Sequence, residues 1–167
     1  QFKEYAIQVK KNASTLAQEL EKLGYKIVTE GTDNHLILWD LRPLKLTGSK
    51  LEKATEICSI TLNKNAVHGD VSALSPGGVR LGASSLTSRS FREKDFVTVA
   101  NFLHRAVQIS LKVQEEAPSK LLKDFVKGLE NNSEILDLKA EVQSFARNFP
   151  MPGFNPLEIR RRNDYTS

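Results

Sequence analysis

The chain has 167 residues, of which 40% are hydrophobic and 26% charged, and its formal net charge is +4. This length is sufficient for one domain with a hydrophobic core. The 24 Lys and Arg residues barely outnumber the 20 Asp and Glu residues, which indicates a mixed-charge surface and no nucleic-acid partner. No run of 18 apolar residues occurs, so the sequence predicts no membrane span.

The single cysteine, Cys58, cannot form an internal disulfide, as is typical of proteins in a reducing compartment. It lies in the apolar stretch ATEICSITL, and no accompanying His/Asn arrangement points to a nucleophile, so we expect a buried, inert thiol. The chain begins with Gln1 inside an expected helix. We therefore expect either that it was cut from a longer polypeptide or that leading residues are disordered or absent.

The first half of the chain predicts two helices and four strands. Apolar residues at spacings of three and four indicate a helix over residues 2–23, which ends before Gly24. Thr47 and Ser49 are candidate N-caps of a second helix that runs to about residue 58, and Ser49 also begins a capping-box pattern. Short apolar or alternating segments predict strands over residues 25–30, 35–41, 60–63 and 79–82.

The second half predicts three helices. Ser90 and Glu93 have the spacing of a capping box, and the helical stripe that follows them continues to about Glu116. Further stripes predict helices over residues 121–129 and 133–149, the last of them capped by Ser133. The order α-β-β-α-β-β-α-α-α indicates an α/β two-layer sandwich, in which a small antiparallel or mixed sheet lies against helices.

Arg80 is the strongest candidate for a ligand-binding residue. It stands in a predicted strand between two apolar neighbours, where a buried guanidinium needs a partner. Its planar fork suits the carboxylate of a ligand, but the spacing alone favours pairing with an internal carboxylate or extension into solvent. Gly77, Gly78 and Gly82 nearby would allow either a ligand or another part of the backbone to come close. The residues alone leave these alternatives open.

The remaining polar residues do not form a recognisable active site. The glycines around Arg80 match neither a phosphate-binding loop nor a dinucleotide-binding motif. The spacings of His35, His68 and His104 match no metal motif. We expect a surface role for His104 and a turn-stabilising role for His35.

Several longer motifs resemble serine hydroxymethyltransferase, and they occur in the family's order. They are TDNHLILWDLRP (32–43), ITLNKNAVHGD (60–70), PGGVRLG (76–82), LTSRSFREKDF (86–96), KLLKDFVKGLENN (120–132) and FPMPGF (149–154). The chain resembles the C-terminal small domain of the eukaryotic, cytosolic-type members, which is the small domain of a fold-type I enzyme. The resemblance assigns residues 1–154 to this domain and leaves 155–167 as an irregular tail.

The resemblance implies a part of an enzyme that uses pyridoxal 5′-phosphate to transfer a one-carbon unit from serine to tetrahydrofolate, leaving glycine and methylenetetrahydrofolate. It implies that Arg80 holds the carboxylate of the amino acid and that Asn65 contacts folate. The Schiff-base lysine and most cofactor contacts belong to the family's N-terminal domain, so the chain alone is expected to be inactive. The resemblance also implies a cytoplasmic location and a homo-oligomer for the full-length enzyme.

The chain departs from the family after Arg80. Members usually read GTPAxTSRG, whereas this chain has Ala83, Ser84 and Ser85 in place of Thr-Pro-Ala and Ser90 in place of the final Gly. We expect the Ser90 change to be benign because serine can act as an N-cap. His68 also stands where an apolar residue or Pro is usual. These departures favour an alternative, a truncated non-catalytic relative that acts as a binding or regulatory module.

Overall fold

The computed structural model describes residues 1–72 and 75–153, and within these ranges it contains six α-helices and four strands. A 3-10 turn, η1 (Arg42–Leu44), follows the second strand. The helices are α1 (Phe2–Lys22), α2 (Gly48–Ile57), α3 (Ser84–Ser88), α4 (Glu93–Glu116), α5 (Leu122–Leu129) and α6 (Ser133–Ala146). The strands are β1 (Lys26–Ile27), β2 (Leu36–Asp40), β3 (Asn63–Asn65) and β4 (Gly78–Gly82). The tail predicted for residues 155–167 lies outside the described residues.

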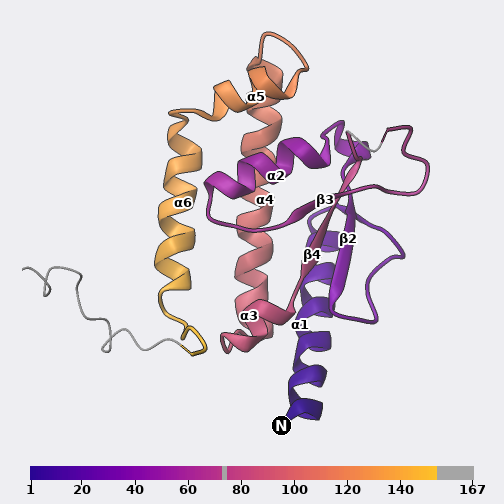
Figure 1. The fold of residues 1–167 in the computed structure, drawn as a ribbon, viewed down its shortest axis with the longest axis vertical. Helices are drawn as coiled ribbons and strands as arrows, with labels where there is room; N and C mark the ends of the chain where they lie inside the picture. The colour runs from indigo at the N-terminus through magenta and orange to yellow at the C-terminus, as the bar shows by residue number, and fades with distance from the viewer. Residues whose placement is uncertain (73–74, 154–167) are drawn as a thin grey trace, which may run out of the picture.

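The four strands form one sheet in the order β1-β2-β4-β3, and every neighbouring pair is antiparallel. Figure 1 shows α4 in the middle of the molecule, with α1 beside the sheet and α6 alongside α4. None of the helices in the described part of the chain is long and apolar enough to cross a membrane. The predicted α/β architecture is confirmed, and the sheet is antiparallel rather than mixed.

The two faces of the sheet have different surroundings. Ile37 and Trp39 of β2 pair with Leu81 and Val79 of β4, and all four side chains are buried in the core with the helices. The alternating residues point to the opposite face, where the side chain of Leu38 is half-buried and Arg80 is exposed. We call this second side the open face.

Two predicted strands are shorter or shifted. The strand expected over 25–30 contains only Lys26–Ile27, because Thr29 and Glu30 adopt positive φ angles of 69° and 51° and turn the chain away from the sheet. The strand expected over 60–63 begins only at Asn63 and runs to Asn65. The helices were predicted more accurately than these strands because a strand of two or three residues leaves too little periodicity to detect.

The caps of the later helices also differ from the prediction. The N-cap of α4 is Arg92, whose backbone N–H donates to the Asp95 carboxylate at 2.9 Å, so Ser90 and Glu93 do not form the expected capping box. Asn132, not Ser133, caps α6 by accepting the N–H of Ile135 at 3.0 Å. The short helix α3 was not predicted at all.

Ser90 instead occupies a backbone conformation that favours glycine. Its φ is +70°, in the left-handed region, and its side chain is exposed. We therefore predict that Ser90→Gly raises the free energy of unfolding by about 1 kcal/mol, because glycine removes the steric cost of this conformation. Chemical denaturation would measure the change.

The control for this prediction is Ser85→Gly in α3. Ser85 is exposed and helical, so glycine there should lower stability through its greater loss of conformational freedom. A Ser90→Gly variant that is destabilised as much as Ser85→Gly would contradict the strain at position 90.

Candidate functional site

Arg80 lies in the middle of β4 on the open face. It pairs with Leu38 of β2 on one side and with Asn63 of β3 on the other, and its side chain is exposed. No hydrogen bond or ion pair engages its guanidinium among residues 1–72 and 75–153. Within these ranges Arg80 therefore takes part in no salt bridge, and its five N–H donors are open to a ligand or to water.

Asn65 lies on the same face of the sheet as Arg80. It is the last residue of β3 and pairs with Gly78, two positions before Arg80 in β4, which makes the two side chains diagonal neighbours. In an antiparallel sheet such neighbours lie about 7–8 Å apart. The half-buried Asn65 side chain donates through Nδ2 to the carbonyl oxygen of Ala66 at 2.7 Å. A guanidinium and an amide are thus diagonal neighbours on the open face.

The glycine pair before Arg80 serves packing within the chain. A Cβ on Gly78 would lie 2.7 Å from the carbonyl oxygen of Trp39 and 2.8 Å from a methyl group of Val67. A Cβ on Gly82 would meet only ordinary contacts, the nearest at 3.6 Å. Of the two alternatives predicted for these glycines, close approach of another part of the chain is the one realised at Gly78.

A buried carboxylate lies at the end of β2, opposite Gly78. The side chain of Asp40 is 2% exposed and accepts two hydrogen bonds from Arg42, Nε to Oδ1 and Nη2 to Oδ2, both at 2.9 Å. Lys26 adds an ion pair at 3.2 Å. The hydrogen bonds from the Arg42 guanidinium lower the pKa of Asp40 to about 2, although burial opposes the shift.

A second carboxylate, Asp70, closes the connection between β3 and β4. Its Oδ2 accepts the backbone N–H of Val67 at 2.9 Å and that of Gly77 at 2.8 Å, and these bonds lower its pKa. Arg42 Nη1 lies 3.7 Å from Asp70 Oδ1 and donates to the carbonyl oxygen of His68 at 2.9 Å. Sequence reasoning missed this network. Its only signal was the presence of both aspartates in the motifs that resemble the family.

The depressed pKa of Asp40 predicts a loss of stability in acid. Its pKa falls from an ordinary value of 3.8 to about 2, so ionised Asp40 stabilises the folded state above pH 4. This contribution, about 2 kcal/mol, is lost as the pH falls from 4 to 2. Denaturation at several pH values should show a smaller loss over this range in Asp40→Asn, whereas the exposed Asp33→Asn should keep the full loss. An identical pH dependence in Asp40→Asn would refute the assignment.

The segment that follows Arg80 departs from the family, but its structure accommodates the changes. Ala83 is fully buried, and its N–H donates to the carbonyl oxygen of His35 at 3.0 Å. Ser84 is the first residue of α3, a position where proline is favoured because its missing N–H has no helical acceptor. The serine therefore leaves an N–H that needs no partner within the helix.

Residues on both sides of the fold hold this segment in place. Asn12 of α1 is buried and donates to the Thr87 hydroxyl at 2.8 Å and to the Phe91 carbonyl oxygen at 3.0 Å. Arg89 donates to carbonyl oxygens near the end of α6, at distances of 2.6 to 3.2 Å. These acceptors belong to Ala146, Phe149 and Pro150.

The other predicted candidates have structural roles or lie on the surface. Cys58 is fully buried, as predicted, and burial raises the pKa of its thiol to about 11. His104 is half-buried and its Nδ1 lies 2.7 Å from the Tyr25 hydroxyl, so the predicted surface role was wrong. No group of His, Cys, Asp and Glu within the described ranges could hold a metal ion.

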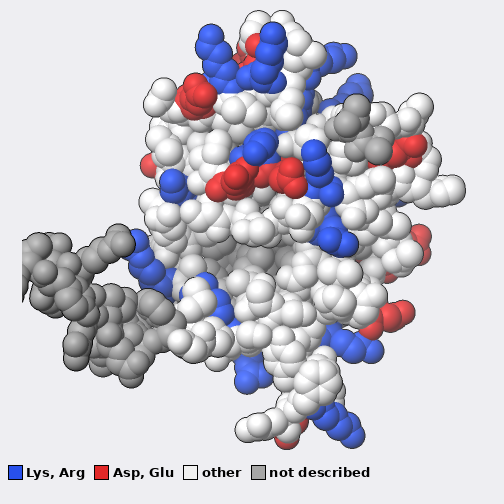
Figure 2. All heavy atoms as spheres, in the orientation of Figure 1, with Lys and Arg blue, Asp and Glu red and all other residues white. Residues whose placement is uncertain are grey.

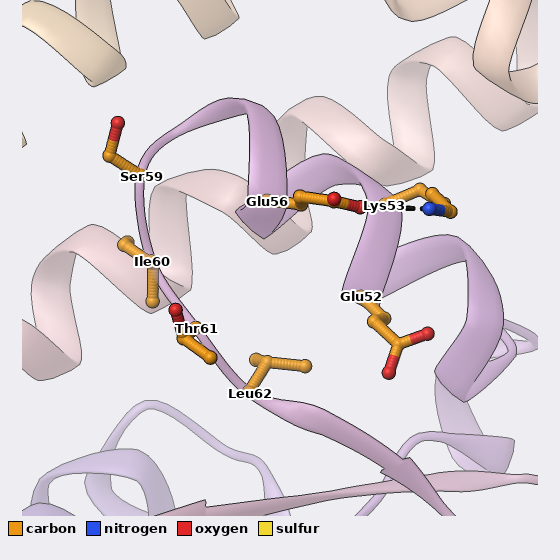
Figure 3. A pocket seen from close by; sticks show the side chains of 7 residues that line it. All are labelled: Glu52, Lys53, Glu56, Ser59, Ile60, Thr61 and Leu62. Carbon is orange, nitrogen blue, oxygen red and sulfur yellow. Dashed lines mark hydrogen bonds and ion pairs between the residues drawn. The ribbon is translucent and has the colours of Figure 1, made fainter.

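A cavity of about 440 Å³ lies between α2 and the segment that leads into β3 (Figure 3). Its charged residues already have partners, since Lys53 pairs with Glu56 at 2.8 Å and Glu52 accepts the N–H of Lys64 at 2.9 Å. Figure 2 shows basic and acidic side chains interspersed over the visible face around a hollow. None of the predicted site residues lines this cavity. Its lining consists of Glu52, Lys53, Glu56, Ser59, Ile60, Thr61 and Leu62.

Comparison with known proteins gives one consistent result. The sequence model of the family described as serine hydroxymethyltransferase matches residues 1–103. Serine hydroxymethyltransferase 5 of Arabidopsis thaliana is 60% identical over 159 residues, which is 95% of this chain and 34% of the relative. The cytosolic serine hydroxymethyltransferase of Oryctolagus cuniculus is 48% identical over 158 residues, 92% of this chain and 33% of the relative. The chain thus spans about a third of the length of these curated relatives. It belongs to the serine hydroxymethyltransferase family.

Proposed function

We propose that the chain is the C-terminal part of a serine hydroxymethyltransferase and contributes one wall of its active site. Arg80 binds the carboxylate of serine or glycine, and Asn65 contacts tetrahydrofolate. The observation that supports this best is an arginine with no partner among the described residues, next to an amide on the same face of the sheet. A guanidinium and a carboxylate form two parallel hydrogen bonds, which orient the amino acid as well as hold it.

The lysines of the sheet that carries Arg80 do not fit the covalent anchor of pyridoxal 5′-phosphate. That cofactor needs a lysine, and the two lysines of the sheet are unsuitable. Lys64 is paired with Val79, so it alternates to the face opposite Arg80, and Lys26 is ion-paired with Asp40. We therefore propose that the cofactor is bound by the N-terminal domain that the longer relatives contain, and that this chain alone does not catalyse the reaction. Domain boundaries of 1–154 and 155–167, a cytoplasmic location and a homo-oligomeric full-length enzyme complete the proposal.

A hybrid protein tests this function directly. The matching third of the Arabidopsis thaliana relative would be replaced by this chain, and the serine-dependent formation of glycine and methylenetetrahydrofolate would be measured. We expect activity in the hybrid and none in this chain alone. A hybrid that folds and gains the absorbance of bound cofactor but forms no product would favour the alternative, a non-catalytic binding or regulatory module.

A further inference from the structure

The strand that carries Asn65 is weakly held by its own pairing. β3 has three residues and lies at the edge of the sheet, where it pairs with β4 alone. Side chains alternate along a strand, so a slip of one residue would move Asn65 to the face opposite Arg80. The juxtaposition of these two residues therefore depends on whatever fixes the register of β3 against β4.

Asp70 joins the two ends of the β3–β4 connection through one oxygen atom. Its Oδ2 accepts the N–H of Val67, two residues after Asn65, and the N–H of Gly77, three residues before Arg80. Both bonds are shorter than 3.0 Å, and the Asp70 side chain is only 10% exposed. Asp70 therefore fixes how many residues separate the closed connection from each strand, at Val67 after β3 and at Gly77 before β4.

Arg42 attaches the connection between β3 and β4 to the end of β2, an inner strand of the sheet. It is bonded to Asp40, the β2 residue that pairs with Gly78, and it donates to the carbonyl oxygen of His68 in the connection. A Cβ on Gly77 would lie 2.6 Å from Asp70 Oδ1 and 2.7 Å from Arg42 Cγ, so the backbone at Gly77 packs directly on both side chains. Arg42 thus holds Asp70 and His68 against the end of β2, while Asp70 holds Val67 and Gly77 together.

We propose that Asp70 is a positioning residue that sets the register of β3 and so keeps Asn65 on the same face as Arg80. The ligand side of this inference rests on the function proposed above for Asn65 and Arg80. Glu52 of α2 assists from the outer edge, where its carboxylate accepts the N–H of Lys64 at 2.9 Å. Asp70 acts at the C-terminal end of β3, where the connection to β4 and Arg80 begins.

Amide hydrogen exchange in this chain tests the closure without any ligand. In Asp70→Ala, the Val67 and Gly77 amides lose their acceptor and should exchange about tenfold faster or more. Asp70→Asn keeps an oxygen that can accept the same bonds but loses the ion pair with Arg42, so its rates should lie between those of Asp70→Ala and the unaltered chain. Asp33→Ala, which removes an exposed carboxylate from the turn before β2, should change neither rate.

The hybrid protein tests the consequence for binding. We expect Asp70→Ala to raise the KM for tetrahydrofolate about tenfold with little change in kcat, and Asp70→Asn to restore part of the affinity. Unchanged exchange at both amides would overturn the closure, and faster exchange with an unchanged KM would overturn the positioning role. An unaltered hybrid without activity would instead refute the proposed function, and the exchange rates would still decide whether Asp70 holds the two strands.

Discussion

Replacing Arg80 with alanine should raise the KM for serine by about 30- to 1000-fold in the hybrid protein. Under the proposed function, the substitution removes two parallel hydrogen bonds to the substrate carboxylate, a contact expected to contribute about 2–4 kcal/mol. Because Arg80 makes no hydrogen bond or ion pair with the described part of the chain, its removal should leave the free energy of unfolding nearly unchanged. Steady-state kinetics and denaturation of the same variant separate the two effects.

Two further variants sharpen this test. Arg80→Lys keeps the charge but not the planar fork, so its KM should fall between those of Arg80→Ala and the unaltered protein. Arg147→Ala removes an exposed arginine after α6, away from the sheet, and should leave the KM unchanged. Equal KM values for Arg80→Ala and Arg147→Ala would rule out the carboxylate-binding role.

Gly48→Ala should be the most destabilising single-methyl substitution that we predict. Gly48 begins α2, and a Cβ there would lie 2.0 Å from the carbonyl oxygen of Gly78 in β4. Its N–H also donates to the carbonyl oxygen of Pro76 at 2.8 Å, so the helix and the strand cannot separate without losing this bond. We expect a loss of about 3 kcal/mol in the free energy of unfolding, because the contact is with backbone that cannot rotate away.

Gly82→Ala provides the comparison, in β4, the strand that Gly48 contacts. A methyl group there meets its nearest neighbour at 3.6 Å, so the stability should change by less than about 1 kcal/mol. Urea denaturation of both variants would measure the difference. A Gly48→Ala protein as stable as Gly82→Ala would show that α2 and β4 do not pack as closely as the structure has them.

The elements that the sequence predicted well are those with many periodic residues. The stripes of α1 and α4 extend over 21 and 24 residues, and both helices were predicted nearly to their ends. β2 was recognised because its five residues belong to a short apolar run that follows a turn cluster. The helix α3 escaped prediction because its sequence, SSLTS, contains a single large apolar side chain and no stripe.

The candidate site was predicted from the resemblance to a family. The network of Asp40, Arg42 and Asp70 beside it could not be predicted from the sequence. The spacing around Arg80 favoured an internal partner or solvent over a ligand, and the structure shows no such partner within residues 1–72 and 75–153. Nothing in the spacing of Asp40 and Asp70 indicates that Arg42 contacts both, since that contact depends on how the β3–β4 connection folds back on the end of β2. Long-range electrostatic contacts of this kind leave no periodic pattern in a sequence.

The hydrogen bonds of Arg89 have a consequence for biosynthesis. Three carbonyl groups, the last at Pro150, accept from this one guanidinium, and they lie 57 to 61 residues further along the chain. During translation α1, α2 and the sheet can form while these acceptors are still inside the ribosome. The segment beside Arg80 then reaches its final bonding only after residue 150 has emerged. The end of α3, where Arg89 lies, therefore completes its packing late, after the sheet has assembled.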